Sequence, residues 1–164
     1  MELLLQSLKS YTNARMVVLR TLGSSSFSCP QISDATDLTI SMIRGRQHNA
    51  TLWRPHELGQ LAEMLRLPNR FADHLKTISQ HLDELAPSQF QQVRSFIKLT
   101  PAQIASRKKD YRLWQFAELE RLLNGLSKLV EADSSKQEAI IATASKRGRK
   151  SKMPVDSILR MVSR

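Results

Sequence analysis

The segment that most constrains the fold is residues 28–65, where apolar residues are spaced as in two short helices joined by a tight corner. The first helix would bury Ile32 and the second would bury Ile43. Asp37 lies at the corner, where a positive φ is usual, and Asp tolerates that conformation better than most residues. Thr39 is then placed to cap the second helix, because its hydroxyl can accept an orphan backbone N–H.

Two short helices with one buried and one exposed face, joined in this way, predict a helix-turn-helix. The apolar pattern continues beyond them at helical spacing through Leu58, Leu61, Ala62 and Leu65, and then reaches Leu67 and Pro68. Over roughly residues 13–70 the chain resembles the helix-turn-helix domain of the lambda-repressor and Cro-like (XRE-type) family. The resemblance implies an all-α DNA-binding domain whose second motif helix enters the major groove.

Three positions depart from the pattern of that family. Ser33 stands where a small Ala is usual, and Asp37 stands where Gly is usual. Arg46 occupies a normally apolar position, which predicts that the second motif helix ends early, at Gly45. A helical bundle that shows this spacing by chance is the alternative. The motif is favoured because its register holds across three helices.

Length and composition predict a soluble, largely helical protein of one or two small domains in 164 residues. The single Cys29 excludes a disulfide framework and a cysteine zinc site, and it fits a reducing cytosol. The first residues do not have the pattern of a signal peptide, and no apolar stretch is long enough for a membrane span. We therefore expect a cytoplasmic, nucleoid-associated protein.

The formal net charge of +10 is concentrated in the last part of the chain. Residues 134–164 contribute +6, residues 1–71 contribute +3, and the middle contributes +1. A basic balance suggests a nucleic acid or another anionic surface as a partner. Because most of the excess lies in the tail, charge alone does not support the helix-turn-helix interpretation.

Helical periodicity also predicts the elements that flank the motif. A helix over residues 2–10 would precede a second over residues 14–22, capped by Thr12 or Asn13. Phe27 and Trp53 are expected to fill the core, and part of Met42 is expected to be buried.

The middle of the chain predicts a bundle of amphipathic helices. One apolar seam comprises Phe71, Leu75, Ile78, Leu82 and Leu85. A capping box at Ser88 and Gln91 would open the next helix, and Thr100 would cap another that runs to about Ala132. Its seam comprises Phe116, Leu119, Leu123, Leu126 and Val130. The bundle could form within one chain or between two, and homodimerisation is expected.

The segment from Leu99 to Ala105 has features of the start of another helix-turn-helix. The apolar positions that follow do not keep register with the motif, because Asp110 falls where an apolar residue is needed at the corner. We therefore predict no second motif. The basic cluster that begins at Arg107 is interpreted as the solvated face of a helix.

The last part of the chain predicts a flexible basic tail. The segment from Asp133 to Lys136 is expected to break the preceding helix. The segment Arg147-Gly148-Arg149, a glycine between two arginines, resembles an AT-hook, which binds the minor groove. This segment lacks the Pro that usually follows. A disordered tail that adds sequence-independent attraction to phosphate is the favoured interpretation.

Motifs of catalysis are not found in the sequence: it contains no Gly-rich phosphate loop, no paired Cys, and no HExxH or GxSxG arrangement. The four His residues share no metal-ligand spacing with carboxylates. The chain is therefore not expected to be an enzyme, and no cofactor, metal or small-molecule substrate is implied.

Together these patterns predict an all-α protein in three parts. They are a helix-turn-helix DNA-binding domain over residues 1–70, a helical bundle or dimerisation domain over 71–132, and a flexible basic C-terminal tail over 133–164. The predicted function is sequence-specific regulation of transcription, repressor-like, in a bacterium, phage or plasmid. The alternatives are a protein-interaction factor that binds polymerase or a host regulator, and an architectural or partition protein that coats DNA.

The predicted partner is double-stranded DNA, bound by two groups of residues. Those nearest the bases are Thr39, Ile40, Ser41 and Arg44, among which Arg44 could reach guanine and Ile40 a thymine methyl. Those expected to contact phosphates are Gln31, Arg46, Gln47, His48, Asn49, Lys146, Arg147, Arg149 and Lys150.

Overall fold

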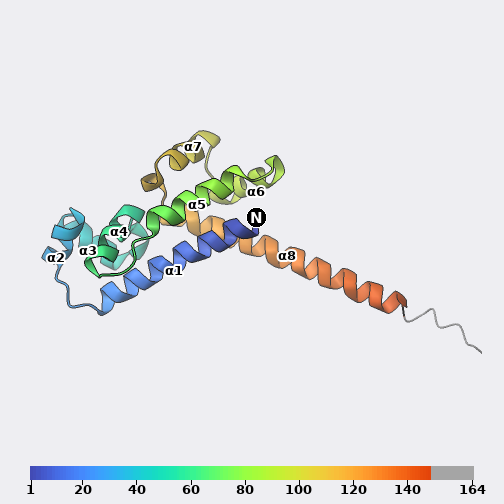
Figure 1. Cartoon of the computed structure of the whole chain (residues 1–164), viewed down its shortest axis with the longest axis horizontal. Coiled ribbons are helices and arrows are strands. Elements are labelled where there is room, and N and C mark those ends of the chain that lie inside the picture. Colours follow the sequence, from blue (N-terminus) through green and yellow to red (C-terminus); the bar gives the residue numbers. More distant parts are fainter. Residues whose placement is uncertain (149–164) are drawn as a thin grey trace, which may run out of the picture. The chain divides into compact units, whose positions relative to one another are not determined.

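The structure is a computed structural model that describes the backbone of residues 1–148 and the side chains of residues 1–132. Within the described part every regular element is a helix, which confirms the predicted all-α class (Figure 1). The elements are α1 (Glu2–Ser24), α2 (Cys29–Thr36), α3 (Ile40–His48), η1 (Ala50–Leu52), α4 (Pro55–Met64), α5 (Phe71–Asp83), α6 (Pro87–Ile97), α7 (Pro101–Lys109), η2 (Tyr111–Leu113) and α8 (Phe116–Gly148).

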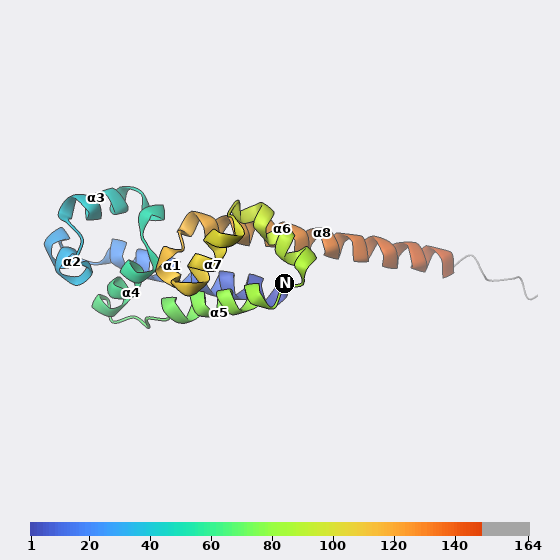
Figure 2. The ribbon, with the colours of Figure 1, turned by 90° about the horizontal axis from the view of Figure 1, so that it is seen from above.

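Residues Met1–Ser127 form one compact unit, and Lys128–Arg164 belong to a second unit. Inside the first unit α1 and α5 run antiparallel and pack along each other (Figures 1 and 2). Tyr11 and Phe71 meet edge to face at this contact, with ring centroids 5.8 Å apart. The contact joins the two sides of the boundary expected near residue 70, so residues 1–70 do not form a compact unit of their own.

Helix α1 is continuous from Glu2 to Ser24, which corrects the prediction of two helices. The Thr12 hydroxyl donates to the carbonyl oxygen of Leu8 at 2.9 Å, so it satisfies itself along the helix instead of capping a new one. Phe27 was expected to fill the core, but 38% of it is exposed; Met42 is 43% exposed and so is partly buried, as expected. Trp53 does lie in the core, as predicted.

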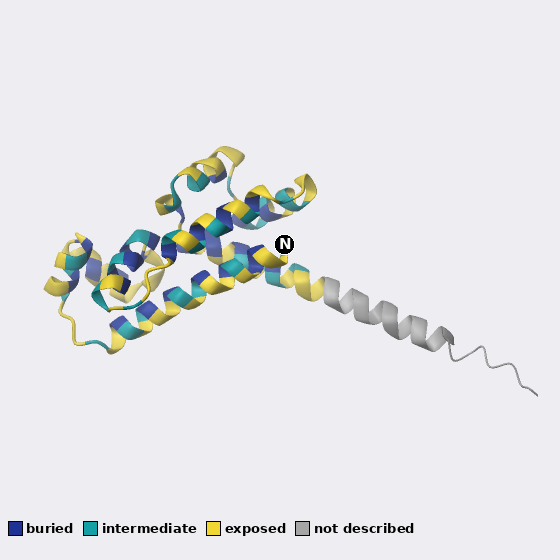
Figure 3. Cartoon of the chain, in the orientation of Figure 1, coloured by how far each residue is buried: buried dark blue, intermediate teal, exposed yellow. Residues whose placement is uncertain are grey.

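The apolar seam of α5 is used within the chain (Figure 3). Its buried members are Phe71, Leu75, Ile78 and Leu82. In α8, Phe116, Leu119 and Leu126 of the predicted seam are buried, together with Leu122, whereas Leu123 is only partly buried. All the buried residues belong to one core cluster with the residues of α1 and α4. The bundle that the sequence predicted therefore forms inside the first unit.

Three helix boundaries differ from their predictions. Helix α6 begins with Ala86 as its N-cap, and Gln89 accepts the Ala86 backbone N–H, so Ser88 is not the cap. The helix capped by Thr100 stops at Lys109, and α8 begins only at Phe116. Helix α8 then continues to Gly148 without a break after Ala132, because Asp and Ser lower helix propensity only by tenths of a kcal/mol, unlike Pro.

The second part of the first unit repeats the local structure of its first part. Lys98 has a left-handed conformation (φ 59°) like Asp37 (φ 54°), 61 positions earlier in the chain. Two positions after each of them a threonine, Thr39 or Thr100, accepts a backbone N–H at the start of the next helix. A second helix pair, α6 and α7, therefore repeats features of the first. It starts one helix before Leu99, so it is not the motif considered from Leu99 onward.

The corner of this pair is at Lys98, so Asp110 does not occupy a corner position. In the structure it corresponds to Asn49, which caps η1 by accepting the Thr51 N–H at 3.1 Å. Asp110 caps η2 in the same way by accepting the Arg112 N–H at 3.0 Å. Asp caps a helix as effectively as Asn does, because both are short side chains whose oxygen can accept the backbone N–H two residues later.

The two copies also exchange large and small residues at one contact. The Phe96 ring on α6 lies against Gly125 on α8, where an added Cβ would come within 2.3 Å of a ring atom. The equivalent positions of the first copy are Ala35 on α2 and Met64 on α4. The first copy has a small residue on α2 and a large one on α4, and the second copy has a large residue on α6 and a small one on α8. The summed side-chain volume at the contact is therefore similar in the two copies.

This arrangement predicts that Gly125→Ala destabilises the protein by about 1–3 kcal/mol, because overpacking against Phe96 outweighs the gain in helix propensity. Gly45→Ala is the matched control, since an added Cβ at that helical position meets no atom within 4 Å. It should stabilise by up to about 1 kcal/mol. Urea unfolding measures both, and a Gly125→Ala protein as stable as the parent would show that the Phe96 ring moves aside.

Candidate nucleic-acid interface

The corner between α2 and α3 has the geometry that the sequence predicted. Asp37 adopts the left-handed conformation, and the Thr39 hydroxyl accepts the Met42 backbone N–H at 3.3 Å. Ile32 and Ile43 are buried on the inner faces of the two helices. The side chain of Ser33 donates to the Leu38 carbonyl oxygen at 2.5 Å, so the hydroxyl at a usually apolar position is satisfied across the corner.

The outer face of α3 carries the residues expected to lie nearest the bases. Thr39, Ser41 and Arg44 are exposed, and 40% of Ile40 is exposed. They are presented together at the start of α3 because Ile43 holds the opposite face of the helix in the core. This leaves α3 with one apolar inner edge and a continuous outer surface.

Arg46 does not lie on that surface, which corrects its assignment as a phosphate contact. Its guanidinium donates to Glu57 through Nε (2.8 Å) and Nη2 (2.7 Å), and both side chains are almost fully buried. Nη1 also donates to the Met42 carbonyl oxygen, and the guanidinium lies 5.8 Å from the Trp53 ring centroid. Arg46 thus fastens α3 to α4 instead of facing a ligand.

The same pair explains why α3 does not end at Gly45. An Arg at this position needs a buried acceptor, and Glu57 on α4 supplies one that also accepts the Arg54 backbone N–H at 2.9 Å. With its charge satisfied, Arg46 fits the inner face of α3, and the helix continues to His48.

The remaining candidate phosphate contacts are exposed but partly occupied. Gln47 accepts from the Cys29 thiol with 3.7 Å between Oε1 and Sγ, and Asn49 caps η1 through its side-chain oxygen. The Gln31 oxygen accepts the Ser28 backbone N–H at 2.8 Å, which is the helix cap that starts α2. In all three residues the oxygen is used inside the protein, which leaves the amide NH₂ group as the one that can donate to phosphate.

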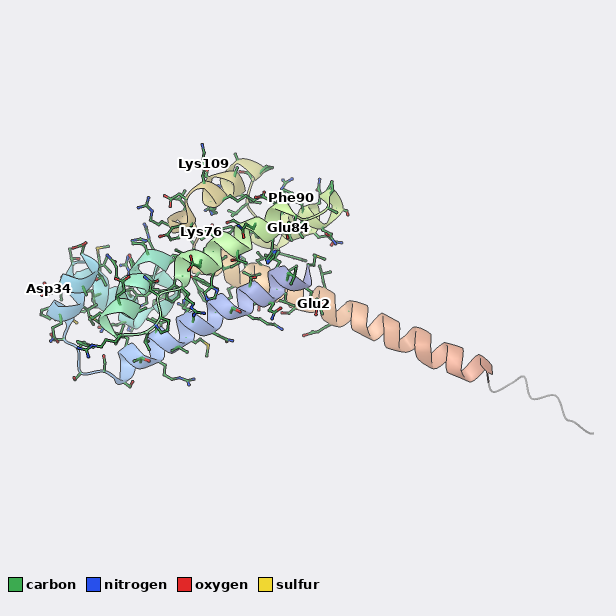
Figure 4. All side chains as sticks on the ribbon, in the orientation of Figure 1. Glu2, Asp34, Lys76, Glu84, Phe90 and Lys109 are labelled. Carbon is green, nitrogen blue, oxygen red and sulfur yellow. The ribbon has the colours of Figure 1, made fainter. Side chains whose placement is uncertain are left out.

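The charge of this surface is close to neutral. Arg44 is the exposed cation of α2 and α3, and the same two helices with their corner carry Asp34 and Asp37, both exposed. Asp34 lies on the outer side of α2 (Figure 4). Electrostatic attraction to phosphate at the first helix pair (α2 and α3) is therefore weak.

The four tail residues proposed from the sequence cannot be added to this surface. Lys146 and Arg147 lie on the last turns of α8, in the part whose side chains the structure does not describe. Arg149 and Lys150 lie outside the described residues.

One buried cation near the interface was missed by the sequence analysis. Arg15 on α1 donates through Nη2 to the Ala50 carbonyl oxygen in η1, and its guanidinium lies 3.6 Å from the centroid of the Phe116 ring. Burial lowers the pKa of Arg15. The signal in the sequence is an arginine in register with the apolar face of α1, between Tyr11 and Val18.

Comparisons with known proteins add no assignment, because no family model, curated protein or solved structure matches the chain. Among the described residues, no three side chains of His, Cys, Asp or Glu are grouped so that they could hold a metal ion. Within the same part of the chain, no helix is both long enough and apolar enough to cross a membrane.

Removal of the Arg46 side chain is expected to act on stability. Arg46→Ala leaves the Glu57 carboxylate buried without its partner, which should cost about 3–5 kcal/mol. Replacing both residues together, as R46M/E57L, should be much less destabilising, because no charge is then left uncompensated. Chemical unfolding of the two variants and the parent tests this, and equal losses for the single and double variants would contradict it.

Proposed function

We propose that the chain binds double-stranded DNA through α2 and α3, as a helix-turn-helix of the lambda-repressor type, and regulates transcription from the site it occupies. The observation that carries the proposal is the corner at Asp37 and Thr39, which presents the start of α3 while Ile43 and Arg46 fix its inner face. A helix held in this way enters the major groove with its first residues toward the base edges.

Each exposed residue of α3 then has a chemical role. Arg44 donates to guanine O6 and N7, Ser41 forms a shorter hydrogen bond to a base, and Ile40 packs on a thymine methyl. The amide groups of Gln31, Gln47 and Asn49, together with His48, hold phosphates beside the groove. Thr39 serves as the helix cap, and its contacts with DNA are limited to the sugar-phosphate backbone. A repressor needs only to occupy its site, so no cofactor takes part.

Homodimerisation on an inverted repeat remains part of the proposal but needs a surface other than the predicted seams. Most residues of the α5 and α8 seams, as far as Leu126, are buried or packed against the core of the first unit. Light scattering at micromolar concentration, with and without DNA, distinguishes a dimer from a single chain.

A second candidate function, binding of another protein, is favoured by one observation. The first helix pair exposes two large apolar side chains, Ile40 and Met42, beside Asp34 and Asp37. A surface that is apolar and weakly acidic is better suited to a protein partner such as polymerase or a host regulator than to phosphate. Coating of DNA by the basic tail, the architectural alternative, would require binding without sequence preference.

Selection of bound fragments from a random DNA pool, with the purified full-length chain, separates these functions. Enrichment of one sequence supports the regulator, and binding without enrichment supports the architectural function. Failure to bind DNA leaves the protein-interaction function.

On the selected site, Arg44→Ala should cost about 1–3 kcal/mol of binding free energy and relax discrimination at one base pair, because a bidentate contact to guanine is lost. Ser41→Ala should give a smaller change of the same kind. Fluorescence anisotropy on the selected site and its single-base variants measures both.

Met16→Ala is a suitable control, since Met16 is exposed on α1 and belongs to neither helix of the motif. Circular dichroism must show that each variant keeps its helices. Should folded Arg44→Ala and Ser41→Ala proteins keep the affinity and the site ranking of the parent, α3 does not read bases.

A further inference from the structure

The repeat described above extends to the interactions of individual side chains. Arg107 donates to Glu118 through Nε (2.8 Å) and Nη2 (2.7 Å), and through Nη1 to the Gln103 carbonyl oxygen. These are the bonds that Arg46 makes to Glu57 and Met42, each 61 positions earlier. Glu118 accepts the Gln115 N–H as Glu57 accepts the Arg54 N–H.

One side-chain contact between the two helices of each pair is repeated as well. In the first pair Cys29 on α2 contacts Gln47 on α3. The equivalent residues of the second helix pair (α6 and α7) are Phe90 and Lys108, and the Lys108 ammonium lies 5.5 Å from the Phe90 ring centroid. The same two positions therefore meet in both copies, although α6 and α7 approach each other less closely than α2 and α3 do.

The second helix pair differs from the first in its charge. Residues 87–109 contain five Lys or Arg and no Asp or Glu, whereas residues 29–48 contain two Arg and two Asp. Arg107 is paired with Glu118, and Lys108 is paired with Asp83. Lys98 and Lys109 are exposed and form no ion pair within the part of the chain that the structure describes.

The outer face of α7 has alanines where α3 has polar side chains. Ala105 stands at the position of Arg44, and Ala102 stands at the position of Ser41; both are exposed. Gln103, the longest polar residue at the start of α7, uses its side-chain oxygen to accept the Thr100 N–H at 2.9 Å. This face therefore lacks the bidentate donors that distinguish one base from another.

Lys98 and Lys109 lie at opposite ends of α7, one at the corner before it and one in its last turn. Figure 4 shows Lys109 on the outer side of α7. Two ammonium groups that flank a helix face of small side chains suit the close approach of a polyanionic backbone, with the positive charges on phosphates and the helix between them.

We propose that the second helix pair is a second DNA-binding surface, which holds the phosphate backbone of the duplex through Lys98 and Lys109 and does not read its sequence. The inference extends the proposed function and rests on it for the identity of the ligand. The two pairs then divide the work: α3 supplies sequence discrimination from a nearly neutral surface, and α6 and α7 supply electrostatic affinity.

The test compares two variants that each remove two positive charges from exposed lysines. In the first, K98N/K109Q, Asn is chosen at position 98 because it tolerates the left-handed conformation found there. In the control, K9Q/K76Q, both lysines are exposed on α1 and α5, outside either helix pair. Thermal unfolding must show that both variants are folded.

The probe is a labelled duplex of about 30 base pairs that carries the site selected from the random pool, together with a scrambled duplex of the same composition. For K98N/K109Q, affinity at about 0.15 M salt should fall roughly 10- to 30-fold on both duplexes alike. The slope of log K against log salt should become shallower by about 0.9 for each lost phosphate contact. The control should change affinity by about 2-fold or less, because its lysines contribute only a screened, distant attraction.

Each outcome bears on one proposal or the other. A K98N/K109Q protein that behaves like the control overturns the second surface, while a continued effect of Arg44→Ala keeps the proposed function. A changed ranking of sites in K98N/K109Q overturns the assignment to phosphate. Loss of affinity in K98N/K109Q with a silent Arg44→Ala supports the second surface and removes sequence reading by α3. A parent chain that binds neither duplex overturns both proposals.

Discussion

The buried pair of an arginine and a glutamate, formed twice, is the interaction on which the rest of the first unit depends. Arg46–Glu57 and Arg107–Glu118 each connect the second helix of a pair to the helix that supports it. Each glutamate also caps its own helix by accepting a backbone N–H three residues earlier. One carboxylate therefore fixes both the orientation of the second helix of the pair and the starting point of the helix that supports it. A buried charge of this kind tolerates few alternative arrangements.

These pairs also explain why α3 and α7 stay in place without contacts from their outer faces. A short helix of nine residues is unstable alone and must be held by tertiary contacts. In each copy one isoleucine, Ile43 or Ile104, and one arginine supply those contacts from the inner face. The residues of the outer face do not hold the helix in place, so they can differ between the copies without loss of the fold.

The parts of the structure that follow from local pattern were predictable from the sequence, and those that depend on distant partners were not. Asp37, Thr39 and Ile43 were placed correctly because corner geometry, capping and helical spacing act within a few residues. Arg46 was misplaced because its partner lies 11 residues away on another helix, and an arginine looks exposed until that partner is known. The second helix pair was missed because the candidate motif was started at Leu99, one helix too late, which placed Asp110 at the corner that Lys98 occupies.

The contact of Phe96 with Gly125, where the first copy has Ala35 and Met64, shows that the two halves are not interchangeable. Two identical subunits related by a two-fold axis present the same surface in either direction along a duplex. A chain whose two halves differ in charge and in side-chain length presents a different surface in each direction. Because both halves belong to one polypeptide, the second half cannot be replaced by another copy of the first. On the DNA proposed as its ligand, such a chain would bind in one orientation, with the first helix pair at the bases and the second at the phosphates.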